Sequence, residues 1–306
     1  MNFTDCHADT LTQIPDGESL WENTCSLDLR RAQSFAGSHT QIFAVFEDKK
    51  KMERGNLEQG FLRRYEKALS HLQSGSRHLK WCKDAEDMRL AHEQKKTAAF
   101  LSIEDVSIMG SLAKDAFDLG FRFAQLCWNY ENEYACGALS GQEKGLSEKG
   151  KSLAKELLKK GMVLDLSHLS DQGVLDIFSM TDKPVIATHS NVREICGHPR
   201  NLKKEQVKEL IRRRGLLGLN FYAPFVGEMG MGDFLLHIDA VCELGGEDIL
   251  AIGSDFDGCK DLMEGILDVG SIPALWRYLE KNGVGIGTLE KIFWKNANRF
   301  LCQNMP

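Results

Sequence analysis

The chain has 306 residues, a hydrophobic content of 42% and a net charge of −6. These values are ordinary for a globular protein, and they give no electrostatic reason to expect nucleic acid or an anionic membrane as a partner. No apolar run approaches membrane-spanning length, and no basic segment followed by an apolar one opens the chain. The nine cysteines include no Cys-x-x-Cys pair. We therefore expect no membrane association, no zinc site built from thiolates and a cytoplasmic location.

Short apolar runs recur along the chain, each followed by a polar turn and an amphipathic stretch. The runs are rich in Val, Ile, Leu, Phe and Ala and are too short for helices. Several of them lack polar alternation, which is typical of strands buried on both faces. We expect strands at residues 2–6, 41–46, 98–103, 121–127, 162–166, 184–187, 216–219 and 249–252.

Helical patterns lie between these runs. Ser147 is a good N-cap for a helix that ends at Gly161, and a second helix at 203–214 is expected to end at Gly215 in the same way. Eight strand–helix units predict a parallel sheet closed into a single (β/α)₈ TIM barrel over residues 1–306. The alternative is an open doubly wound sheet. No Gly-x-Gly-x-x-Gly follows the first strand, which weakens the usual dinucleotide-binding form of that alternative.

The first expected strand ends in a His-x-Asp pair. His7 and Asp9 are two residues apart, so in extended chain their side chains project to the same side. An imidazole nitrogen and a carboxylate oxygen together suit Zn²⁺. The pair is also common by chance, and Asp9 could instead cap the next helix.

Three further candidate ligands follow buried runs. Glu104 ends the run at 98–103, where an unpaired charge would be costly, so it needs either a Lys or Arg partner or a metal. His168 and His189 follow the runs at 162–166 and 184–187. One such histidine would usually be a hydrogen-bonded core residue. Two at the same end of adjacent strands favour a metal site.

Two aspartates flank the turn after the last expected strand. Asp257 precedes a glycine, a pattern typical of turns, and we assign it a structural role. Asp255 is then left for chemistry, as a group that can take up and release a proton.

Together these residues are stronger evidence for a metal site than any of them alone. Six polar side chains fall at the carboxyl ends of five expected strands, and in a closed barrel those ends meet at one face, where this fold places its active sites. A catalytic zinc usually takes three protein ligands, so five ligands can serve two zinc ions if Glu104 bridges them. A hydroxide between the ions would be the nucleophile, and Asp255 would pass its proton to the leaving amine.

The same residues resemble the membrane dipeptidase (renal dipeptidase) family, peptidase family M19. The matching segments keep the family's order over nearly the whole chain, and their combination is far more specific than any one of them. They are residues 5–9, 103–104, 164–168, 188–191, 198–201, 219–222 and 253–258.

The resemblance implies a metal-dependent amidohydrolase-like barrel that hydrolyses dipeptides, including those with a C-terminal D-residue, and that forms a homodimer. It implies two Zn²⁺ per chain, bridged by Glu104 and a hydroxide. His7 and Asp9 complete one site, and His168 and His189 complete the other. Asp255 matches the family's acid/base residue.

The resemblance also indicates substrate-binding residues. Arg200 matches an arginine that grips the C-terminal carboxylate of the substrate, which a guanidinium can do bidentately, although a surface salt bridge is the alternative. Tyr222 either lines the site or packs. Mammalian members carry a histidine after the fourth strand that helps hold the oxyanion, but this chain has Trp128-Asn129 there. Asn129 or a zinc ion could polarise the carbonyl instead.

Two other functions stay open at this point. One is another metal-dependent amidohydrolase, such as a deaminase or lactonase, but many of those use His-x-His and a modified lysine, whereas here Cys127-Trp128 ends the fourth strand. The other is a non-catalytic barrel that binds a metal or a peptide. A pure binder has no use for a proton shuttle, so Asp255 argues against it.

Overall fold

Eight parallel strands form a closed barrel in the computed structural model, which describes residues 1–49 and 57–305. Neighbouring strands pair in order around the ring; β9 pairs with β1, and β2 pairs with β4, which closes it. This confirms the predicted TIM barrel and rules out the open sheet. The strands of the ring are β1 Phe3–Ala8, β2 His39–Val45, β4 Thr97–Ile103, β5 Phe121–Gln125, β6 Val163–Asp165, β7 Ile186–Ala187, β8 Leu216–Leu219 and β9 Leu250–Ile252.

A ninth strand, which the sequence did not predict, lies outside the ring. β3 (Leu79–Trp81) pairs only with β4 among the described strands, from Leu79 opposite Thr97 to Trp81 opposite Ala99. Its three residues are too few to give an apolar pattern, and two of them are only partly buried.

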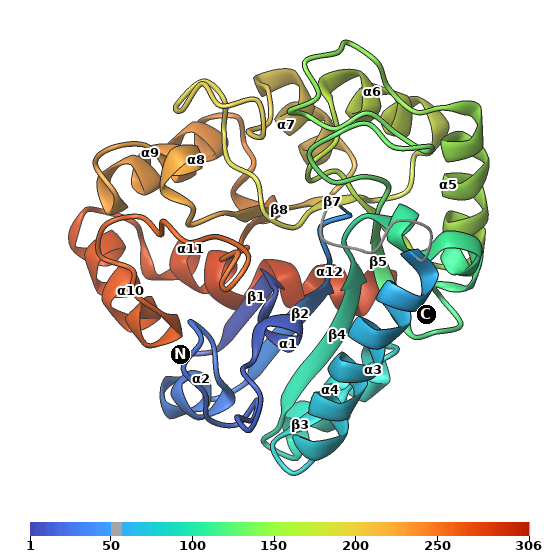
Figure 1. Ribbon diagram of the computed structural model, residues 1–306. Coiled ribbons are helices and arrows are strands. Elements are labelled where there is room, and N and C mark those ends of the chain that lie inside the picture. Colours follow the sequence, from blue (N-terminus) through green and yellow to red (C-terminus); the bar gives the residue numbers. More distant parts are fainter. Residues whose placement is uncertain (50–56, 306) are drawn as a thin grey trace.

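Helices surround the barrel (Figure 1). The α-helices are α1 Thr10–Gln13, α2 Leu29–Phe35, α3 Leu57–Ser74, α4 Ala85–Glu93, α5 Glu148–Lys160, α6 Asp171–Met180, α7 Lys204–Arg212, α8 Ala223–Val226, α9 Met231–Glu243, α10 Ile272–Lys281, α11 Ile286–Glu290 and α12 Asn296–Asn304. Helical segments of other types occupy Val106–Asp115, Glu247–Ile249, Val269–Ser271 and Lys291–Lys295.

The ends of two helices test the capping predictions. Ser147 accepts a hydrogen bond from Gly150 N at 3.0 Å, and Gly161 ends α5 with a φ of 100°, so that prediction is confirmed. The end predicted for α7 is wrong, because the helix ends at Arg212 and Arg214 takes the left-handed backbone with a φ of 53°. Gly215 is needed for a different reason. A Cβ there would lie 2.5 Å from the Val185 carbonyl oxygen beside β7.

The core has two parts. One lies between the strands and the surrounding helices, and the other lies inside the barrel, where strand residues such as Phe100 and Phe123 meet Phe300 and Leu301 of α12. Asn296 at the start of α12 donates hydrogen bonds to the carbonyl groups of Leu250, the first residue of β9, and of Glu247 just before it. Helix α12 therefore covers the amino end of the barrel with apolar side chains, and the polar groups of the strand ends gather at the opposite mouth.

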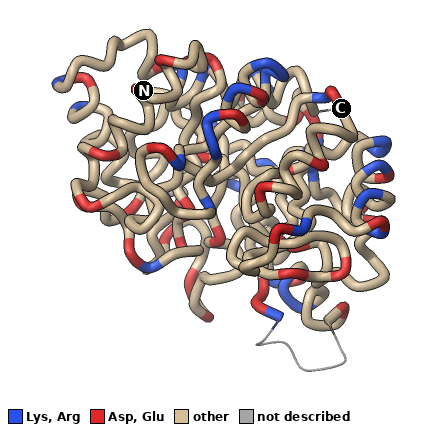
Figure 2. Tube along the Cα trace, turned by 90° about the horizontal axis from the view of Figure 1, so that it is seen from above, with Lys and Arg blue, Asp and Glu red and all other residues tan. Residues whose placement is uncertain are grey.

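The surface is mixed in charge. Basic and acidic segments are interspersed around the tube in Figure 2, and many of them form exposed pairs such as Arg89 with Glu86. Among the described residues, every helix is too short or too polar to cross a lipid bilayer.

Candidate metal centre

The six side chains predicted to carry chemistry meet at the carboxyl mouth of the barrel. Five of them are at most 5% exposed: His7, Asp9, Glu104, His168 and His189. Asp255, after β9, is partly buried and lines the same cavity as Glu104 and His168. Groups that are up to 248 residues apart in the chain, at Asp255 and His7, are thus brought to one place by closure of the barrel.

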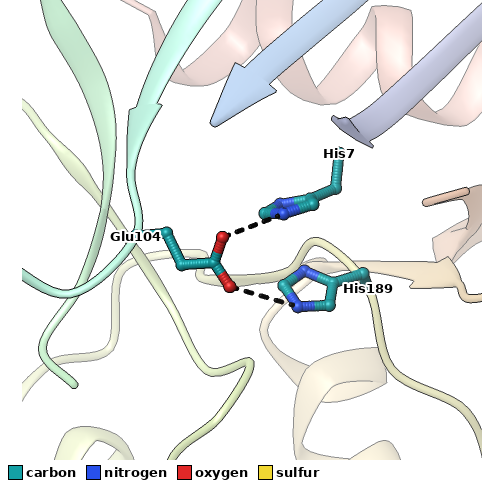
Figure 3. Close-up of side chains that lie close together, drawn as sticks. All are labelled: His7, Glu104 and His189. Atoms are coloured by element: carbon teal, nitrogen blue, oxygen red, sulfur yellow. Dashed lines mark ion pairs between the residues drawn. The ribbon is translucent and has the colours of Figure 1, made fainter. Parts of the chain in front are cut away.

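The carboxylate of Glu104 lies between two sets of histidines. Its Oε2 is 3.3 Å from His7 Nε2, and its Oε1 is 2.8 Å from His168 Nε2 and 3.9 Å from His189 Nε2. Figure 3 shows the two oxygens pointing to different rings. Among the described residues, the ion pairs of Glu104 are all with histidines, so the Lys or Arg partner considered from the sequence is not there. A carboxylate placed in this way can bridge two cations.

Two of the histidines turn their Nε2 atoms towards each other. His168 Nδ1 is 2.8 Å from Asn129 Oδ1, and His189 Nδ1 is 2.9 Å from Thr188 Oγ1, while the two Nε2 atoms are 2.8 Å apart. Burial holds the pKa of both rings well below the ordinary value, so both are neutral. If each proton is on Nδ1, two nitrogen lone pairs and a Glu104 oxygen face each other, an arrangement that a cation stabilises.

The other half of the centre contains His7, Asp9 and Asp255. Ligand atoms of these three residues lie within 4.8 Å of one another. His7 Nε2 and Asp9 Oδ1 are buried without a hydrogen bond, although His7 Nε2 is 3.4 Å from the other Asp9 oxygen. Asp9 does stand at the N-cap of α1, but its side chain makes no capping hydrogen bond. The helix-cap alternative is therefore wrong, and these atoms fit a metal ligand set.

Electrostatic effects at the centre are strong. Burial opposes a charge on His7, but Glu104 and Asp9 outweigh it and hold the pKa of His7 well above its ordinary value. Burial, with the like charge of Asp9, raises the pKa of Glu104 to about 7 and that of Asp255 to about 6. Such a concentration of shifted groups in a cavity is typical of a functional site.

Several non-glycine residues at the mouth have positive φ angles, which only glycine adopts easily. His168 has a φ of 72° and Asp255 a φ of 61°, both in the left-handed region. Asp257, with a φ of 68°, accepts hydrogen bonds from Thr10 Oγ1 and Ser26 N at 2.6 Å each, contacts that support its structural assignment. Gly258 has no side chain, which leaves space for the Asp9 and Asp255 carboxylates. A Cβ there would lie 2.3 Å from an oxygen of each.

A cavity of about 430 Å³ opens above these groups, and Arg200 lies in its wall. Arg200 is 3% exposed, and its Nε makes no hydrogen bond. One terminal nitrogen donates to His189 O at 3.4 Å, and the guanidinium lies over the Phe225 ring. Burial lowers its pKa to about 10, so it stays charged at neutral pH. The surface salt bridge considered from the sequence is wrong, because Arg200 has no carboxylate partner in the described part of the chain.

Tyr222 and Asn129 also line the cavity. Tyr222 packs edge-on against Phe225 at 4.8 Å between ring centroids, so it both lines and packs. Asn129 uses its oxygen on His168, and its Nδ2 makes no hydrogen bond within residues 1–49 and 57–305. The Asn129 oxygen is therefore placed to orient a histidine of the centre.

Sequence reasoning gave no site role to Phe46, Thr188 or Asp165, and it noted Trp128 only as a residue in the place of the family's histidine. Phe46 and Trp128, with ring centroids 5.1 Å apart, form an aromatic wall of the cavity, and Thr188 and Asp165 lie behind the histidines. Thr188 directly precedes His189, and Asp165 lies in the predicted strand that leads to His168. A hydroxyl directly before a candidate ligand was the available signal for Thr188.

Comparison with known proteins identifies the family of this chain. A sequence model of the membrane dipeptidase family (peptidase family M19) matches residues 1–304. The dipeptidase aclJ of Aspergillus oryzae is 29% identical over 220 residues, which are 69% of this chain and 52% of that one, so this chain spans about half the length of that relative.

Two solved structures share the whole fold. The crystal structure of the dipeptidase AC, a family M19 metallopeptidase, has a TM-score of 0.87 at 26% identity and covers 100% of this chain and 99% of its own. A metallopeptidase from Rhodobacter sphaeroides, liganded with a phosphinate mimic of the dipeptide L-Ala-D-Ala, has a TM-score of 0.85 at 24% identity, with the same coverage. The chain belongs to the membrane dipeptidase family, peptidase family M19, a family of metal-dependent hydrolases that act on dipeptides.

Proposed function

We propose that this protein hydrolyses the peptide bond of dipeptides that carry a free C-terminal carboxylate, using two zinc ions. The observation that supports this most is the position of Glu104, whose two oxygens face different histidines at the floor of a cavity that also holds a buried, unpaired arginine. The first feature suits a pair of cations, and the second suits an anionic end group of the substrate.

The ligand types fit zinc. His7 and Asp9 would hold one ion, His168 and His189 the other, and Glu104 would bridge the two. Imidazole and carboxylate are ligands that Zn²⁺ prefers, and the site is too poor in oxygen ligands for Ca²⁺ or Mg²⁺. When bound, the ions would lower the pKa of a water molecule held between them and supply a hydroxide at neutral pH.

The chain's own residues would bind and orient the substrate. Arg200 would grip the C-terminal carboxylate and so fix the peptide bond relative to the centre. Asn129 Nδ2 would donate to the carbonyl oxygen. Asp255 would accept a proton during attack and donate it to the leaving amine, a task that suits a carboxyl group whose pKa is raised to about 6. The cavity has the size of a small-molecule site, which suits a dipeptide better than a longer chain.

The proposal also covers the stereochemistry of the substrate, the oligomeric state and the location of the protein. We include dipeptides with a C-terminal D-residue among the substrates, and the bound L-Ala-D-Ala mimic of the Rhodobacter fold relative makes that class worth testing. A homodimer, a cytoplasmic location and a single domain over residues 1–306 stay predictions.

A panel of dipeptides tests the proposal. Zinc-loaded enzyme should hydrolyse L,L and L,D dipeptides, lose the activity on treatment with a chelator and regain it with zinc. Glu104→Gln is the control that keeps shape but removes the bridging charge. Tight binding of dipeptides without turnover, in protein shown to carry two zinc ions, would favour the non-catalytic barrel instead.

A further inference from the structure

Thr188, directly before His189, has a fully buried side chain with contacts on two sides. Its Oγ1 lies 2.9 Å from His189 Nδ1 and within hydrogen-bond distance of Asp165 Oδ2. The same oxygen is 3.4 Å from His7 Nδ1, a longer and weaker contact. One hydroxyl therefore touches a candidate ligand from each half of the centre.

Asp165 is surrounded by hydrogen-bond donors. Its Oδ1 accepts from the backbone N–H groups of Ser167 at 2.9 Å and Thr188 at 3.0 Å. Its Oδ2 accepts from Gln125 Nε2 at 2.8 Å and from Thr188 Oγ1. All four contacts are donated to Asp165, which accepts with both oxygens, so the Thr188 hydroxyl donates its hydrogen bond to Asp165.

The direction of the next hydrogen bond follows from that proton count. A threonine hydroxyl has one proton, and here it is directed to Asp165. Towards His189, Thr188 Oγ1 can then only accept, so His189 Nδ1 must carry a proton. The neutral ring has its remaining lone pair on Nε2, which faces Glu104 and His168.

We propose that Thr188, held by Asp165, is a positioning residue that fixes His189 in the Nδ1–H tautomer and so prepares its Nε2 to bind a metal ion. This inference rests on the proposed function, because it assigns His189 to a metal. The same hydroxyl oxygen also lies 3.4 Å from His7 Nδ1, where it can accept from that nitrogen, so one side chain links the two halves of the centre.

The tautomer can be read without any metal. The experiment is ¹⁵N NMR of histidine-labelled, metal-free full-length protein, with the His189 signals assigned by their loss in His189→Asn. Wild type and Thr188→Ser should show His189 protonated at Nδ1. Thr188→Val, which keeps the shape but removes the hydroxyl, should shift His189 to a mixture or to the Nε2–H form.

Zinc affinity gives the second readout. Loss of an outer partner of a metal ligand typically weakens binding by about 10- to 100-fold, and we expect this for Thr188→Val in competition with a chelator, with Thr188→Ser close to wild type. Thr10→Val is a matched control, since Thr10 is also buried, directly follows a proposed ligand and donates to an aspartate, Asp257, but its hydroxyl makes no hydrogen bond to a proposed ligand within the described residues.

The outcomes separate this inference from the proposed function. A wild-type His189 protonated at Nε2, or Thr188→Val with wild-type tautomer and zinc affinity, would overturn the inference even in an active peptidase. If Thr188→Val fails to fold, the wild-type tautomer still decides. A protein with the expected tautomer and zinc binding but no peptidase activity would overturn only the proposed function.

Discussion

The Asp255 carboxyl group lies beside two of the proposed ligands but is held by a different contact, a hydrogen bond from Asn220 Nδ2 at 3.1 Å. Burial raises its pKa to about 6, so it can exchange a proton near neutral pH. This separates a proton-transfer role from a ligand role, and the two make different predictions.

Asp255→Asn should lower kcat by about 10²- to 10⁴-fold, because the amide keeps the shape and cannot carry the proton. Zinc content should stay at the wild-type value. Steady-state kinetics and metal analysis on the same preparation check both. Loss of a zinc ion in the variant would instead make Asp255 a ligand.

Arg200→Ala should lower kcat/KM by about 10²-fold or more for dipeptides with a free C-terminal carboxylate, because it removes a buried, hydrogen-bonded charge pair with the substrate. C-terminally amidated dipeptides should be hydrolysed about equally by variant and wild type. Arg200→Lys is the matched variant that keeps the charge without the bidentate fork. Equal losses on both substrates would show that Arg200 does not capture the carboxylate.

How far single residues could be predicted depended on their place in the chain. Each proposed ligand lies within three residues of the end of a predicted buried apolar run, and that local signal is strong. The side-chain contact of Asp165 with Thr188 and the aromatic wall of Phe46 and Trp128 join residues from different strand ends, so no local pattern contains them. Asn129 was predicted only as a group that could polarise the substrate carbonyl; the contact of its oxygen with His168 could not be predicted, because it joins residues that are 39 positions apart.

Secondary-structure elements were predictable where their ends carry side-chain signals. Ser147 and Gly161 delimit α5 as expected, and the eight apolar runs coincide with the eight strands of the ring. β3 was missed because it is held mainly by pairing with β4, which only the folded chain reveals. The end of α7 was misplaced because a glycine needed for close strand packing resembles a helix stop.

The cap of α5 predicts a measurable stability change. Ser147→Ala should lower the free energy of unfolding by about 1 kcal/mol, because the hydrogen bond from Gly150 N is lost. Urea unfolding of the metal-free protein measures it. Ser152→Ala, at an exposed position within the same helix, should be neutral or slightly stabilising, since alanine is the better helix former. Equal destabilisation by the two changes would contradict the capping role.

For the molecule as a whole, a buried histidine far from the centre couples folding to pH. His39 lies at the start of β2, stacked on Phe3 and bonded to Thr97, and burial lowers its pKa to about 3. In the unfolded chain, His39 has its ordinary pKa of about 6.5 and binds a proton below that pH. In the folded chain it stays neutral down to about pH 3. The stabilising effect is present above pH 6.5 and is lost as the pH falls towards 3.

The expected size of this effect is about 2 kcal/mol between pH 7 and pH 5. His39→Asn removes the titrating group. Between pH 7 and pH 5, the decrease in the free energy of unfolding should therefore be about 2 kcal/mol smaller in the variant than in wild type. Denaturant unfolding of the metal-free proteins at the two pH values measures the difference. Parallel losses in wild type and variant would show that His39 is not the cause.

The arrangement of the whole barrel could be predicted from the alternation of strands and helices, and with it the meeting of distant strand ends at one mouth. The position of α12 over the other mouth could not be predicted, because an amphipathic C-terminal helix fits many surfaces equally well. We propose that these strand ends, by meeting at one mouth, create a site for two ions around Glu104.

Anomalous X-ray diffraction at the zinc edge, on crystals of zinc-saturated protein, tests that claim most directly. We predict two zinc peaks per chain, one on the His7 side of Glu104 and one on the side of His168 and His189, with at least one peak lost in Glu104→Gln. A single peak, or two peaks that both persist in Glu104→Gln, would contradict the account.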